Sequence, residues 1–246
     1  MNNNIKDINL NETGNMNKGD TDNQEIVSIL PIRSMVAFPQ LNVPFMISFS
    51  SAAIIEEARK ADRPIGLLTI KDSDVEHPVP GQLYEVGTMA KILHAKKNEE
   101  GVMVALLNGI YRFKVNTWQS GGSGLKASVV HAPEFVEPGI ELEALQRQLR
   151  EAVTEVLSMT SNSSKGSAEA ISRIEDPLQL VYMSAFNMNL STEARQTILE
   201  IDSVSLKIRE LLSHLLHEKE MLTIGQKIQS EVKEKMNRSQ REFYLR

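Results

Sequence analysis

The sequence predicts an α+β protein with a β-rich lobe, a helical bundle lobe and a long C-terminal helix. Residues 25–135 contain short runs of branched apolar side chains between turn residues, the pattern of strands. Near Pro133–Gly139 the apolar period changes from two to 3.6, the pattern of helices. We therefore expect four regions: a disordered tail over 1–24, the β-rich lobe over 25–135, the helical lobe over 140–201 and the long helix over 202–246.

Composition places the chain among globular proteins and removes several classes of chemistry. It has 246 residues, 41% hydrophobic and 24% charged, which is ample material for a core. It contains no cysteine, so disulfides, thiolate zinc sites and cysteine nucleophiles are excluded. It has no apolar run near the ~18 residues that a membrane helix needs, and we expect a cytoplasmic protein. The net charge of −5 argues against non-specific electrostatic binding of nucleic acid.

The first 24 residues are rich in asparagine and poor in clustered apolar side chains. Such a segment cannot bury enough surface to offset the entropy of ordering it. The sequence predicts a disordered tail, and an arm that folds on binding is the alternative.

The β-rich lobe begins with a strand over Ile26–Leu30 that Pro31 is expected to end. After a loop between Pro39 and Pro44, extended structure is predicted over Phe45–Phe49, followed by a helix that Ser50 or Ser51 caps and that runs through Ala61. Further strands are predicted over Ile65–Ile70, Tyr84–His94, Val102–Leu107, Ile110–Trp118 and Leu125–His131, with turns at 98–101, 108–109 and 121–124. This spacing favours an antiparallel meander or a small barrel.

The helical lobe is predicted from apolar periodicity and capping residues. Leu142, Leu145, Leu149, Val153 and Val156 recur at three and four residues, which indicates an amphipathic helix over Glu141–Met159. A short helix over Ser167–Ile174 follows. Two more are expected: one that Asp176 caps, with Pro177 at its first position, up to Asn187, and one that Ser191 caps, up to Glu200.

The last predicted helix would extend about 65 Å from Asp202 at 1.5 Å per residue, longer than a small domain is wide. Its first half has an apolar stripe, and its second half retains only Ile228, Val232 and Met236 before the terminal Phe243-Tyr244-Leu245. One interpretation is a frayed, solvated terminus. The other is a helix whose partner surface lies outside this chain, which the terminal apolar cluster favours.

A search for catalytic and ligand motifs returns no complete pattern. The sequence contains no P-loop and no motif of a known nucleophile. His214 and His217 share a helix face without a third ligand. Asp72, Asp74 and Glu76 resemble the start of a calcium loop, but position six is not glycine. We therefore expect no cofactor and no metal in this chain, and neither ATP hydrolysis nor casein cleavage by it.

Four segments in order resemble the N-terminal domain of the Lon family of ATP-dependent serine proteases: Leu30–Pro39 with Val43–Phe45, Tyr84–Ile92, Gly109–Phe113 and Arg241–Arg246. The resemblance covers most of Ile26–Arg246. It implies a β lobe like the pseudouridine synthase and archaeosine transglycosylase (PUA) fold, followed by helices. Full-length members are cytoplasmic homohexamers that degrade misfolded and regulatory proteins. ATP and magnesium are implied only for their downstream ATPase module, toward which the long helix would lead.

From the resemblance we expect a non-catalytic region that recognises unfolded substrates and helps a hexamer assemble. Methionine and aromatic side chains adapt to varied apolar partners, so the candidate substrate contacts are Met35, Phe38, Leu41 and Met46. The candidate assembly contacts are Ile228, Val232 and Met236. Two alternatives stay open: most of the four substrate contacts fill the core, or the chain is a stand-alone PUA-like module that binds RNA. We expect no membrane partner.

Overall fold

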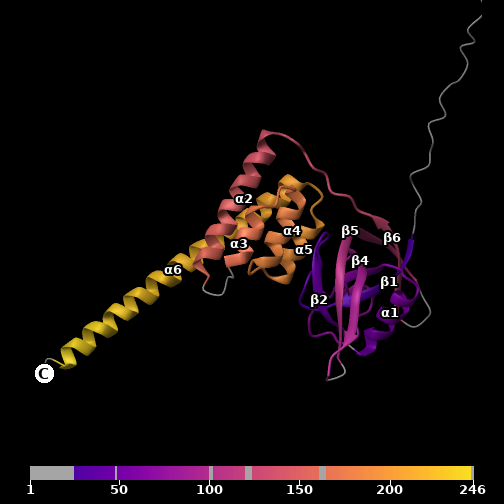
Figure 1. Cartoon of the computed structure of the whole chain (residues 1–246), viewed down its shortest axis with the longest axis horizontal. Helices are drawn as coiled ribbons and strands as arrows, with labels where there is room; N and C mark the ends of the chain where they lie inside the picture. The colour runs from indigo at the N-terminus through magenta and orange to yellow at the C-terminus, as the bar shows by residue number, and fades with distance from the viewer. Residues whose placement is uncertain (1–24, 48, 100–101, 120–123, 161–164, 245–246) are drawn as a thin grey trace, which may run out of the picture.

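The computed structural model describes residues 25–47, 49–99, 102–119, 124–160 and 165–244. Figure 1 shows a β lobe beside a helical lobe, with the last helix projecting away from both. The strands are β1 (Glu25–Ile32), β2 (Asn42–Ile47), β3 (Ile65–Thr69), β4 (Val86–Lys97), β5 (Met103–Gln119) and β6 (Leu125–His131). The helices are α1 (Phe49–Lys60), α2 (Ile140–Met159), α3 (Lys165–Ser172), α4 (Pro177–Asn187), α5 (Thr192–Glu200) and α6 (Val204–Tyr244), with a 3₁₀ turn at Pro80–Gln82.

The strands form a closed barrel with one strand added outside the ring. Their order is β2-β5-β4-β3-β1-β6, and β5 also pairs with β6, which closes the ring. The long β5 serves two neighbours: its first half pairs with β2 and its second half with β6. The predicted small barrel is confirmed. The alternative, a purely antiparallel meander, is wrong because β1 and β3 run parallel.

The predicted turn at Asn108-Gly109 is also wrong, because both residues lie inside β5. The Gly109 N–H donates to the Leu41 carbonyl, and its own carbonyl accepts from the Gln40 N–H, both at 2.9 Å. A Cβ at Gly109 would lie 2.3 Å from the Phe38 carbonyl oxygen. This glycine therefore permits a close approach between two backbone segments and does not reverse the chain.

Several strand boundaries differ from the prediction; β2, for instance, begins at Asn42 and includes Pro44, which the sequence predicts to lie in the preceding loop. Pro31 does not end β1, which continues to Ile32 alongside β3. The missing N–H is tolerated there because the pairing of β1 with β6 stops at Ile29, leaving one side of the strand without a described neighbour. Phe49 is the first residue of α1 and not the end of an extended segment.

The predicted caps of α4 and α5 and the stripe of α2 are confirmed, whereas the predicted cap of α1 is wrong, because Ser50 and Ser51 lie inside that helix. The Asp176 carboxylate accepts from the Gln179 N–H at 2.6 Å, and the Ser191 hydroxyl accepts from the Ala194 N–H at 3.1 Å. These side chains satisfy N–H groups that a helix start leaves unpaired. The predicted α2 stripe is buried, as are Val204, Ile208, Leu211 and Leu215 of α6, which packs against α2.

One hydrophobic core extends through both lobes. The larger cluster joins residues of β1, β2 and α1 to residues of α2, α4 and α6. At the junction the rings of Phe38 and Tyr182 stack with centroids 5.0 Å apart. A smaller cluster around Phe113 fills the barrel. Because the larger cluster crosses between the lobes, their packing energies are coupled.

A buried arginine ties the barrel to the helical lobe. Arg112 of β5 is 1% exposed, and its Nη1 donates to the carbonyls of Leu199, Glu200 and Ile201 at 2.8–3.0 Å. The same guanidinium donates to the carbonyls of Ala132 and Pro133 and to the Asp202 carboxylate. The Leu199 and Glu200 carbonyls lie at the C-terminal end of α5, where the helix dipole favours a positive charge.

Lys207 of α6 lies beside this arginine and is also buried. Its Nζ donates to the carbonyls of Ile198 and Leu199 at 2.6 and 3.0 Å and lies 5.1 Å from the Tyr182 ring centroid. Burial and the neighbouring Arg112 charge lower the pKa of Lys207 to about 7. The Tyr182 hydroxyl donates to the Glu134 carboxylate. Burial and this carboxylate raise the pKa of Tyr182.

Candidate functional site

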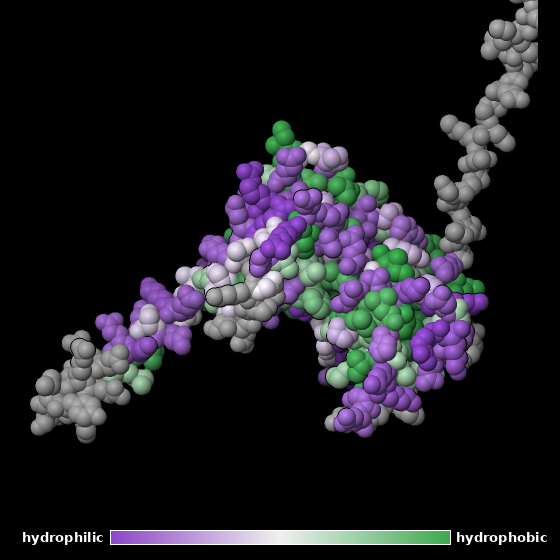
Figure 2. All heavy atoms as spheres, viewed as in Figure 1, coloured by the Kyte–Doolittle hydropathy of each residue, from purple (hydrophilic) through white to green (hydrophobic). Residues whose placement is uncertain are grey.

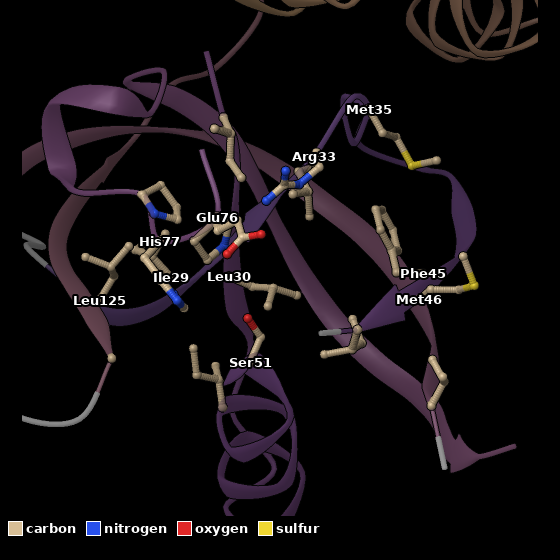
Figure 3. Close-up of a pocket in the computed structure, with 18 of the residues that line it drawn as sticks. Ile29, Leu30, Arg33, Met35, Phe45, Met46, Ser51, Glu76, His77 and Leu125 are labelled. Carbon is tan, nitrogen blue, oxygen red and sulfur yellow. The ribbon is translucent and has the colours of Figure 1, made fainter. Parts of the chain in front are cut away.

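A groove of about 760 Å³ opens on the surface of the β lobe. Figure 3 shows it lying across β1 and β2, with α1 below and the loop after β3 above. The sides are mostly apolar. Its lining includes Ile29–Arg33 and Met35 from the β1 side, Pro44–Ile47 from β2, Ser51 and Ile54 from α1, and Glu76–Pro78 from the loop. Its size is in the range of pockets that hold ligands.

The groove exists because the strand pairing of the barrel is incomplete at this place. Among the described residues β2 pairs with β5 alone, and β1 pairs with β6 only as far as Ile29. The second half of β1 and the outer edge of β2 are therefore left without a strand on one side. Both edges border the groove.

The structure brings two of the four predicted substrate contacts to this groove. Met46 of β2 is 82% exposed, and Met35 is partly buried; both line the cavity. In Figure 3 the two sulfur atoms lie on the same side of the groove. An exposed methionine beside a cavity is a flexible apolar contact that no described residue covers.

The other two predicted contacts, Phe38 and Leu41, are corrected by the structure. Both are buried and belong to the core shared by the two lobes. Phe38 is held there by its stacking on Tyr182. Residues that are already enclosed by the protein cannot contact a substrate without unfolding, so we remove them from the candidate site.

Sequence reasoning missed a polar rim around the groove. The Arg33 guanidinium donates to the carbonyls of Ser73 and Val75, the latter at 2.7 Å. This contact holds the acidic loop that follows β3 close to the groove, and places Glu76 and His77 on its wall. Arg33 lies within the first resembling segment, but the contact joins residues 40 and 42 positions apart, which no local pattern reveals.

The predicted assembly residues lie on the projecting part of α6. Ile228, Val232 and Met236 are 52–59% exposed. Met221 and Ile224 precede them on the same helix and are also exposed, so an apolar stripe runs along α6 beyond the helical lobe. Figure 2 shows mostly hydrophilic residues on the near face of the coloured part of the projecting helix. Contact of these residues with another subunit stays a prediction.

The described residues contain no candidate metal site and no candidate membrane-spanning helix. There, no group of three or more histidine, aspartate or glutamate side chains could hold a metal ion. His214 instead lies 3.2 Å from the Glu210 carboxylate on the same helix. In the same part of the chain, no helix combines the length and the apolar character that crossing a bilayer requires.

Two solved structures with a similar fold are Lon N-terminal domains. The N-terminal domain of the Mycobacterium avium complex Lon protease matches with a TM-score of 0.66 at 21% identity, covering 78% of this chain and 98% of that one. A Lon N-terminal domain protein from Xanthomonas campestris matches with a TM-score of 0.55 at 18% identity, over 77% and 98%. At these identities the likeness defines the fold class.

Sequence comparison identifies the family. The substrate-binding domain of the ATP-dependent protease La (LON) matches residues 26–217, and the chain belongs to this family. It is similar to Lon protease 2 of Thermus thermophilus, with 33% identity over 224 residues, and to a Lon protease of Lawsonia intracellularis, with 33% over 233 residues. These matches span 90% and 92% of this chain but 28% of each relative. The resemblance in the sequence is thereby confirmed.

Proposed function

We propose that this chain captures exposed apolar segments of unfolded proteins for a Lon-type protease, and that the groove between β1 and β2 is where it does so. The observation that carries the proposal is the exposure of Met46 beside an apolar cavity. The family to which the chain belongs is described as substrate-binding. Apolar surface that is exposed in a folded protein and covered by a partner contributes binding energy in proportion to its area.

The experiment compares binding of a permanently unfolded probe by the parent chain and by the double variant Met35→Ser/Met46→Ser. The probe is fluorescein-labelled α-lactalbumin, reduced and carboxymethylated, and binding is followed by fluorescence anisotropy. Losing two apolar contacts should weaken binding about tenfold. Met221→Ser is the matched control because Met221 is an exposed methionine on α6. Equal effects of the control and the double variant would contradict the proposal.

We also propose that the chain is a non-catalytic part of a longer cytoplasmic protease, in which ATP and magnesium act elsewhere. This rests on the relatives, of which the chain spans 28%. The exposed stripe of α6 would then pair with another subunit and support hexamer assembly. The closed barrel is compatible with a PUA-like β lobe. None of the matches described above supports the RNA-binding alternative, and we do not propose it.

A further inference from the structure

The outer edge of β2, which borders the groove, has backbone groups that pair with no strand of the described residues. In an antiparallel pair, alternate residues bond to the neighbouring strand and the residues between them point their N–H and C=O groups away. The Gly109 N–H of β5 donates to the Leu41 carbonyl just before β2. Because the register continues without a shift from Asn42↔Asn108 to Ile47↔Met103, the backbone groups of Pro44 and Met46 face away from β5.

The sequence of β2 agrees with this assignment. Pro44, which has no N–H to donate, occupies one of the outward positions, where the ladder with β5 loses nothing. The side chains of Val43, Phe45 and Ile47 point into the core, whereas Pro44 and Met46 are exposed. The free edge therefore combines the Met46 N–H, the carbonyls of Pro44 and Met46, and apolar side chains on the outer face.

We propose that the groove binds its ligand as an added β-strand, an extended apolar segment of an unfolded polypeptide that hydrogen-bonds to the free edge of β2. The proposal rests on the function proposed above and specifies how the ligand is held. The second half of β1, which has no described strand partner on the groove side, forms the opposite wall. Backbone pairing does not depend on sequence, so a site of this kind accepts many chains, and Met35 and Met46 adapt to their side chains.

Folded proteins and helical segments are poor ligands for such a site. Most of their backbone N–H and C=O groups are already paired, so an extended, unfolded segment pairs with β2 more readily than a helix or an inner strand of a folded sheet does. The single gap in donors at Pro44 keeps the edge from being an open template for aggregation. The site thus selects for the unfolded state through the backbone and for apolar character through the groove walls.

The test separates the backbone of Met46 from its side chain. Met46→Ala removes the side chain and keeps the N–H, whereas Met46→Pro removes both; neither touches the ladder with β5. With the unfolded α-lactalbumin probe, Met46→Pro should bind about five- to tenfold more weakly than Met46→Ala, the effect of one lost hydrogen bond and a blocked edge. Pro44→Ala, which adds an outward N–H, should bind more tightly than the parent. Equal affinities of the Met46 variants would overturn the proposal.

A second measurement keeps the test valid if Met46→Pro unfolds, which thermal unfolding followed by circular dichroism reports. The probe is a labelled ten-residue peptide of alternating leucine and threonine, N-methylated either at all leucines or at all threonines. Strand addition predicts that methylation at one set abolishes binding to the parent chain and methylation at the other set is tolerated. Two methylated peptides that both bind like the unmodified one would overturn the proposal.

Other outcomes are informative about the occupant. If Met35→Ser/Met46→Ser weakens binding but the methylated peptides bind equally, the groove holds side chains only; strand addition is then wrong and the proposed function survives. If neither perturbation matters, both proposals fail.

If sedimentation shows a dimer that Met46→Pro dissociates and Met46→Ala does not, the edge pairs with a second copy. If deletion of residues 1–24 is needed before the probe binds, the occupant is this chain's own N-terminal segment. Either result overturns the proposal.

Discussion

Replacement of Arg112 by methionine tests whether the two lobes are held together by the buried guanidinium. Methionine keeps much of the apolar volume of the side chain and removes every hydrogen-bond donor. Five carbonyls, from Ala132, Pro133, Leu199, Glu200 and Ile201, would lose their guanidinium partner. The nearby Glu134 carboxylate, 3.6 Å from Nε and largely buried, would lose its positive neighbour.

Removing one member of a buried charged cluster costs about 3–5 kcal/mol of unfolding free energy. The Asp202 carboxylate adds little to this cost because it is 64% exposed and water replaces the arginine there. For a chain of this size, each kcal/mol corresponds to about 2–4 °C. We therefore expect Arg112→Met to lower the thermal midpoint by about 6–20 °C. Arg112→Lys should recover only part of the loss, because lysine lacks the planar fork.

The assay is urea unfolding followed at two signals. Trp118 is the only tryptophan and reports on the barrel, while circular dichroism at 222 nm reports mainly on the helices. Arg173→Met is the matched control, because Arg173 pairs with Glu169 on an exposed helix surface and should change stability by less than about 0.5 kcal/mol. If Arg112→Met unfolds within 1 kcal/mol of the parent by both signals, our account of the junction is refuted.

Three further predictions concern the junction, β5 and α6. The pKa of Lys207 is about 7 in the folded chain and 10.5 ordinarily, so between these pH values the unfolded state binds one more proton than the folded state. The free energy of unfolding should therefore rise by about 3 kcal/mol from pH 7 to 9.5, relative to that of Lys207→Met. Parallel pH profiles of the two proteins would contradict this. Gly109→Ala should destabilise by about 1–3 kcal/mol, whereas Gly81→Ala, with no atom within 4 Å of its added Cβ, should change the urea midpoint little. Sedimentation velocity should show weaker self-association, with the barrel's unfolding midpoint unchanged, after serine replaces Ile228, Val232 and Met236; identical oligomer distributions across concentration would exclude the stripe as an assembly element.

The caps of α4 and α5, the stripe of α2 and the change of apolar period were determined by the sequence alone, because their causes lie within a few residues. Asp176 and Ser191 cap their helices through N–H groups three positions away. The stripe of α2 is a periodicity within one helix, and the change of period near Pro133–Gly139 is visible without any contact. The family, too, could be recognised, since its segments are contiguous runs of the chain. In each case no information from distant residues is required.

Only the tertiary structure decided which side chains face the groove. Phe38 and Met46 are both apolar residues near β2, yet one stacks on Tyr182 in the other lobe and the other is exposed. Arg112 reaches carbonyls 87 to 89 positions away. Position 109 requires glycine because the backbone of Phe38 passes so close to it that a Cβ would not fit. A strand has a core side and an outer side, but which of its neighbours is absent depends on how the whole barrel closes. The edge of β2 and the groove beside it are consequences of that closure, and no local pattern specifies them.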